Sequence, residues 1–198
     1  MSAARPPAVA ITGGIGAGKS EALRAFERHG AATISSDEIV HHLLREDEEV
    51  RRRLLERFGD RILDDAGRLD RKAIGEVVFA DREQLRWLEE LLHPLVVREY
   101  LVWREHLARQ TSPPPLTVTE VPLLYEVGGD TRFDAVVVIT APLELRRSRA
   151  RTTVDDREQR LLPDEEKTRR ADFVYENTGS LADLDQFVSD VIAKLSGS

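Results

Sequence analysis

The segment that most constrains this chain is residues 13–20, which read Gly-Gly-Ile-Gly-Ala-Gly-Lys-Ser and fit the pattern G-x-x-x-x-G-K-[ST]. A short apolar run over 8–12 before it predicts a buried strand, and the periodicity of 19–29 after it predicts a helix. Glycines in such a loop let backbone N–H groups turn toward a polyphosphate at the helix N-terminus. A glycine turn that only packs a strand against a helix would need neither Lys19 nor Ser20. We therefore interpret the segment as a nucleotide-binding phosphate loop.

The phosphate-loop motif predicts a role for individual residues. Lys19 is expected to reach the β- and γ-phosphates of ATP and to act in catalysis, and Ser20 to place its hydroxyl on Mg²⁺ bridging those phosphates. The full set of expected nucleotide-binding positions in the loop is Gly14, Ile15, Gly16, Ala17, Gly18, Lys19, Ser20 and Glu21.

Further apolar runs predict the rest of a parallel sheet. Their β-branched content and the helical patterns between them indicate an α/β fold. The expected architecture is a three-layer α/β/α P-loop kinase fold with a mostly parallel five-stranded sheet. The further expected strands cover residues 32–35, 116–121, 133–140 and 173–175.

The region from about 46 to 110 contains amphipathic patterns and no convincing strand, so it predicts a helical insertion, which the family resemblance given below implies is acceptor-binding. Pro94 is expected to kink or break the helix there. We expect one domain over 1–198. Its core covers 8–45 and 115–198, and an arginine-rich lid covers about 146–170.

Composition excludes several classes of function. The net charge of −7 argues against a nucleic-acid surface, and no apolar run approaches the ~20 residues of a membrane span. The absence of cysteine excludes disulfides and favours a reducing compartment. We expect a cytoplasmic protein, monomeric or weakly homo-oligomeric, whose partners are ATP and a small-molecule substrate.

Asp37 follows the second expected strand at the sheet edge where the phosphate loop also lies. A carboxylate there can orient an acceptor hydroxyl and take its proton. It can equally be the N-cap of the next helix. Position alone leaves both interpretations open.

The arginines of the expected lid can surround a migrating phosphoryl group with positive charge. Each can also be an ordinary charge on a helix surface, and one or two are expected to touch phosphate. We expect Arg151 to act in catalysis and Arg157 to bind the nucleotide. The candidates are Arg147, Arg151, Arg157 and Arg160.

Several short motifs together resemble the dephospho-CoA kinase family over nearly the whole chain. Leu-Leu-His-Pro over 91–94, followed by Val-Pro-Leu-Leu-Tyr-Glu over 121–126, is the most specific part. Besides the phosphate loop, the matching segments are 35–40, 165–167, 171–174 and 177–179. The resemblance implies transfer of phosphate from ATP to the ribose 3′-hydroxyl of dephospho-CoA, with Mg²⁺, in the last step of coenzyme A synthesis.

The resemblance also implies which residues act at the acceptor site. Asp37 matches the second carboxylate of the family's Asp-x-Asp element, which makes it the favoured acceptor-site base. Ser35 stands where the first carboxylate is usual. Either Asp37 alone is enough, or Glu38, Glu120 or Glu126 acts with it.

Four more positions are assigned in the same way. His93 and Leu123 are expected at the acceptor, although His93 can equally cap a kink at Pro94. Asn177 and Gly179 are expected near the adenine, or in an ordinary Asn-x-Gly turn.

Two rival functions remain open. A kinase for nucleoside monophosphates or other small metabolites would differ only in what the insertion accepts. An ATP-binding regulatory or scaffold protein would hold the nucleotide without transferring phosphate.

Overall fold

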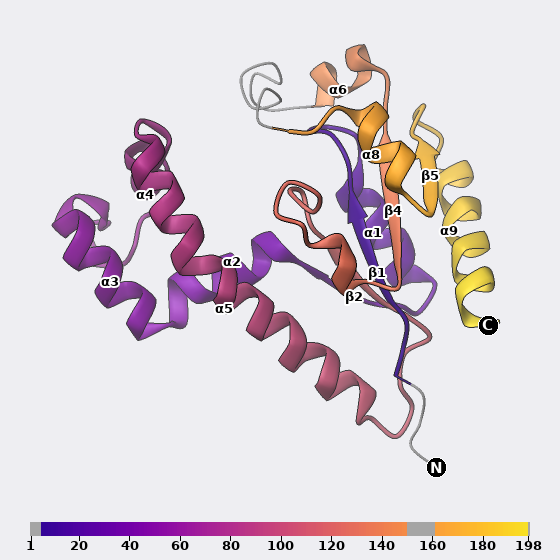
Figure 1. Ribbon diagram of the computed structural model, residues 1–198, viewed down its shortest axis with the longest axis horizontal. Coiled ribbons are helices and arrows are strands. Elements are labelled where there is room, and N and C mark those ends of the chain that lie inside the picture. Colours follow the sequence, from indigo (N-terminus) through magenta and orange to yellow (C-terminus); the bar gives the residue numbers. More distant parts are fainter. Residues whose placement is uncertain (1–4, 150–160, 198) are drawn as a thin grey trace. The chain divides into compact units, whose positions relative to one another are not determined.

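The computed structural model describes residues 5–149 and 161–197, which fall into two compact units (Figure 1). One unit comprises Met1–Ser36 with His106–Ser198, and the other Asp37–Glu105. Helices α2 (Ser36–Glu46) and α5 (Arg82–Ala108) carry the chain between them. Each unit encloses apolar residues of its own, so each is a packed structure in its own right.

A five-stranded sheet organises the first unit, with the strand order β2-β3-β1-β4-β5. Every pairing in it is parallel. The expected α/β fold and five-stranded sheet are confirmed. Because parallel strands end at one edge of a sheet, the loop after β1 lies at the same edge as the ends of β3 and β4. The strands are β1 (Ala8–Thr12), β2 (Ala32–Ser35), β3 (Thr117–Glu120), β4 (Ala135–Thr140) and β5 (Phe173–Glu176).

Alternate side chains of the central strands enter two different apolar clusters, as the pleat of a strand requires. Val9 and Ile11 of β1 pack in a cluster with residues of α1 (Lys19–Arg28) and α9 (Leu181–Ser196). Ala10 belongs to the other cluster, with Val136, Val138, Leu124 and Tyr125. The sheet is thus covered on both faces, which explains why β1 is buried along its whole length.

Two short helices lie largely within the region expected to form a lid. Helix α6 (Leu143–Arg149) begins after Pro142, and α8 (Asp164–Arg170) begins after Pro163. A 3₁₀ turn, η2 (Asp130–Arg132), lies between β3 and β4. The part of the expected lid between α6 and Leu161 lies outside the described residues.

The second unit is helical, as expected of the insertion. Besides α2 and α5 it contains α3 (Glu48–Phe58), η1 (Gly59–Ile62) and α4 (Arg71–Phe79). Asp47 caps α3 by accepting a hydrogen bond from Val50 N at 3.0 Å, and Asp70 caps α4 through Lys72 N at 2.8 Å. The buried side chains of its core are Leu44, Val50, Leu54, Phe58, Ile62, Ile74, Val78 and Leu92.

Helix α5 rules out one of the two alternatives expected at Pro94, the break, because it runs through Pro94 as one helix of 27 residues. Leu92 is buried two residues before the proline, and Tyr100 and Leu107 are buried after it. This burial on both sides offsets the loss of one backbone hydrogen bond. In residues 5–149 and 161–197, no helix is both long and apolar enough for a membrane span.

Candidate nucleotide-binding site

The loop between β1 and α1 has a backbone that only glycine adopts freely. The φ angles of Gly13, Gly16 and Gly18 are 142°, 73° and 99°. The surroundings leave no room for a side chain either. A Cβ atom on Gly13 would lie 2.0 Å from the carbonyl oxygen of Ile139, and one on Gly16 would lie 2.6 Å from that of Arg146. The loop is therefore packed tightly against the end of β4 and against α6.

Lys19, the first residue of α1, folds back over this loop. Its Nζ atom donates a hydrogen bond to the carbonyl oxygen of Gly14 at 2.9 Å. The N-cap residue of α1 is Gly18, which has no side chain of its own to accept hydrogen bonds from the first turn. The loop thus combines an ammonium group with a helix N-terminus, the two features that favour a bound phosphate.

Ser20 lies beside a buried carboxylate. Its Oγ atom donates to Oε2 of Glu120 at 3.2 Å. Glu120 is the last residue of β3 and is only 8% exposed. In the sheet it is the register partner of Ile11 and of Ser35. Of the three glutamates that sequence reasoning left open as a further carboxylate, Glu120 is therefore the one that contacts the phosphate loop.

Asn177, which follows β5, also contacts the phosphate loop. Its Nδ2 atom donates to the carbonyl oxygen of Ala17 at 2.9 Å, and its Oδ1 atom accepts from the backbone N–H of Gly179 at 3.1 Å. Its backbone N–H donates to Thr140 at 2.7 Å. Both ends of the amide thus bind protein backbone, and the Asn-x-Gly turn serves to hold the phosphate loop.

An arginine that sequence reasoning missed lies at this loop. Arg149 is exposed at the end of α6. A Cβ atom on Gly179 would lie 3.6 Å from its Nη2 atom, and one on Gly18 would lie 4.0 Å from Nη1. Arg149 follows Arg146 by three residues and so shares its face of the helix, but the burial of Arg146 that marks this face is known only from the structure.

Of the other arginines named from the sequence, the structure describes Arg147 alone. Arg147 is exposed on α6. Arg151, Arg157 and Arg160 lie outside the described residues.

The remaining expected site residues belong to several different elements. Glu21 directs its carboxylate along α1 to Arg24 at 2.9 Å and Arg28 at 3.2 Å. Leu123 is 39% exposed in the turn after β3.

Two of them belong to the second unit. Asp37 is exposed in the first turn of α2. Because that helix begins at Ser36, Asp37 is not its N-cap residue. His93 is exposed on α5.

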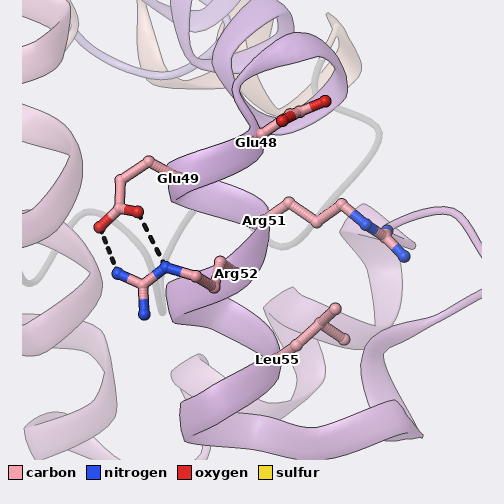
Figure 2. Close-up of a pocket in the computed structure, with 5 residues that line it drawn as sticks. All are labelled: Glu48, Glu49, Arg51, Arg52 and Leu55. Carbon is pink, nitrogen blue, oxygen red and sulfur yellow. Dashed lines mark hydrogen bonds and ion pairs between the residues drawn. The ribbon is translucent and has the colours of Figure 1, made fainter.

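An open hollow of about 640 Å³ lies along α3 in the second unit (Figure 2). Arg52 there pairs with Glu49 at 2.6 Å and also with Glu56. Opposite charges on an exposed face neutralise one another, so this is a solvated helix surface and not a site. The residues that line it are Glu48, Glu49, Arg51, Arg52 and Leu55.

Comparison with known proteins supports the same chemistry. The family model described as dephospho-CoA kinase matches residues 7–183. Dephospho-CoA kinase of Thermus thermophilus is 37% identical over 202 residues, which cover 98% of this chain and 95% of that protein.

Solved structures of similar proteins have the same fold as this chain. TT1252 from Thermus thermophilus superposes with a TM-score of 0.78 at 36% identity, covering 96% of this chain and 98% of the other. Dephospho-CoA kinase from Campylobacter jejuni gives a TM-score of 0.67 at 29% identity, covering 98% of this chain and 100% of the other. The resemblance read from the motifs is confirmed, and the chain belongs to the dephospho-CoA kinase family, whose members transfer phosphate from ATP to an alcohol of dephospho-CoA in the final step of coenzyme A biosynthesis.

Proposed function

We propose that this chain phosphorylates the ribose 3′-hydroxyl of dephospho-CoA with ATP and Mg²⁺, and that the triphosphate binds in the loop after β1. The observation that carries the proposal is the contact between Ser20 and the buried Glu120, directly beside Lys19. A glycine turn with only a packing role has no use for a hydroxyl, a carboxylate and an ammonium at one strand end.

The residues at the loop suit Mg²⁺. Nowhere in the described part of the chain do three or more His, Asp or Glu side chains gather in a metal-binding group. Mg²⁺ in phosphate sites needs less, because one or two protein oxygens suffice when phosphates and waters complete the shell. Ser20 Oγ and the Glu120 carboxylate are those oxygens in our proposal. When bound, the ion neutralises charge on the β- and γ-phosphates.

The remaining roles follow from the chemistry of transfer. Lys19 stabilises the phosphates, and Arg149, Arg151 and Arg157 are the candidates to surround the migrating group. Asp37 accepts the proton of the 3′-hydroxyl while the oxygen forms its bond to the γ-phosphorus. The bond between that phosphorus and the β–γ bridging oxygen breaks, and ADP leaves. His93 and Leu123 are proposed to contact the acceptor.

A product screen tests this function. Purified protein is incubated with ATP and Mg²⁺ and, separately, dephospho-CoA, AMP, CMP or shikimate, and products are identified by mass spectrometry. We expect CoA to form far faster than any other product. Preference for a nucleoside monophosphate would overturn the substrate assignment, and no transfer to any acceptor would favour a scaffold role. We further propose that the protein is cytoplasmic and that it is a monomer or a weak homo-oligomer. Light scattering of the purified protein tests the oligomeric state.

A further inference from the structure

Lys167 in α8 has no solvent-exposed surface. Its Nζ atom lies 3.1 Å from Oε1 of Glu126, in the turn that follows β3. The same Oε1 atom accepts a hydrogen bond from the backbone N–H of Leu162 at 2.8 Å. One carboxylate thus fixes both α8 and the residues that lead into it.

Stability alone does not account for this pair. Burying two charges is costly, and apolar residues of similar size often serve a core as well or better. Apolar packing is already present, because Leu162 and Ala171 pack with Leu124 and Tyr125. The pair is also incompletely satisfied, since Oε2 of Glu126 is buried without a hydrogen-bond partner among the described residues.

The far end of α8 is held separately. Arg170 pairs with Asp130 at 2.9 Å, and its guanidinium lies 4.2 Å from the centre of the Tyr125 ring. Burial raises the pKa of the Tyr125 hydroxyl, and the nearby Arg170 cation opposes that shift. The Glu126–Lys167 pair therefore fixes the middle of α8, and the hydrogen bond from Leu162 N to the same carboxylate fixes the residues just before its first turn.

The first residue of α8 is linked to the phosphate loop through Arg146. Asp164, the first residue of α8, lies 3.5 Å from Nη1 of the buried Arg146. The backbone of Arg146 contacts Gly16 so closely that a Cβ atom there would lie 2.6 Å from its carbonyl oxygen.

We propose that Glu126 and Lys167 are positioning residues for ATP binding, which set α8 so that Arg146 supports the phosphate loop at Gly16. This inference deepens the proposed function and rests on the loop being the ATP site. It also gives a role to Glu126 and Lys167, which belong to the motifs over 121–126 and 165–167 and have no other part in the proposed transfer.

The test measures ATP affinity by calorimetry with Mg²⁺ and without acceptor, alongside thermal melting. In the double variant Glu126→Gln/Lys167→Met both charges are removed together, so it is expected to melt close to the wild type. We expect its dissociation constant for ATP to rise about tenfold, because a misplaced loop loses several phosphate contacts at once. The matched control is Lys72→Met/Glu76→Gln, an exposed pair of the same residue types at 3.7 Å, which should change neither value.

A folded double variant that binds ATP like the wild type overturns the positioning role. If the double variant does not fold, Asp164→Asn replaces it, because this partly exposed residue can be changed without opening the core. Asp164→Asn should weaken ATP binding, whereas Asp130→Asn, which alters the partner of Arg170 at the other end of α8, should not. Equal ATP affinity in these two variants also overturns the role. Wild-type protein that binds ATP but leaves dephospho-CoA unchanged contradicts the proposed function only.

Discussion

Ser20 Oγ and Glu120 Oε2 lie 3.2 Å apart although the two residues are 100 positions apart in the chain. The sheet creates this contact, because β3 pairs directly with β1 and both strands end at the phosphate loop. A hydroxyl and a nearly buried carboxylate at one strand end are suited to a hydrated cation that bridges phosphates.

Glu120→Gln should therefore raise the Mg²⁺ concentration needed for half-maximal activity. The amide keeps the shape of the side chain but removes the charge that attracts the ion. We expect an increase of about tenfold or more, measured by titrating Mg²⁺ at fixed ATP. Glu27→Gln, an exposed change on α1, is the control. An unaltered Mg²⁺ titration for Glu120→Gln would remove this carboxylate from the ion site.

Lys19→Met should abolish most of the turnover. The ammonium that now donates to Gly14 O is the group expected to move onto the phosphates, and methionine keeps only the apolar stem. Loss of one such electrostatic contact typically costs about 10²-fold or more in kcat. Steady-state kinetics measure it, with the exposed Lys72→Met as control. Near-normal kcat in Lys19→Met would contradict the phosphate role.

Comparing Gly16→Ala with Gly67→Ala separates the effect of a steric clash from the effect of backbone strain. Gly16 and Gly67 share a φ angle of 73°, so alanine at either position incurs a similar strain of about 1 kcal/mol. Only at Gly16 does the new methyl group meet another chain segment, while nothing lies within 4 Å at Gly67. We expect Gly16→Ala to lose ATP binding and Gly67→Ala to lose only a little stability. Equal ATP affinities, measured by calorimetry, would argue against the tight loop.

Asn177→Ala should loosen the phosphate loop. The change removes the donor to Ala17 O and the acceptor for Gly179 N–H. We expect a loss of about 1–3 kcal/mol in stability, measured by urea unfolding, together with a higher KM for ATP. Thr178→Ala, at the exposed neighbouring residue, serves as control. A purely adenine-binding role for Asn177 would instead leave stability intact and raise KM alone.

Asp37→Asn should lower kcat by about 10²-fold or more while ATP affinity stays near the wild-type value, because the asparagine amide cannot accept the proton of the acceptor hydroxyl. Rapid-quench kinetics and calorimetry measure the two quantities. Glu46→Gln at the other end of α2 is the control. A wild-type rate of transfer in Asp37→Asn would assign the base to another residue.

Local sequence determined the elements of this protein. Runs such as Ala135-Val136-Val137-Val138-Ile139 form buried strands wherever two layers cover a sheet, and the glycine loop with Lys19 and Ser20 specifies phosphate chemistry by itself. Pro94 shows the limit of that reasoning, because burial of Leu92, Tyr100 and Leu107 favours a continuous α5 where local propensity allows either a kink or a break.

Tertiary structure alone decided which distant side chains serve the loop. Asn177 contacts Ala17 across 160 positions, and Glu120 was one of three candidate glutamates until strand order placed it beside Ser20. Arg149 was not among the candidates at all. Propensity and periodicity act over a few residues, whereas these contacts depend on how parallel strands and their crossovers pack, and no short stretch of the chain specifies that packing.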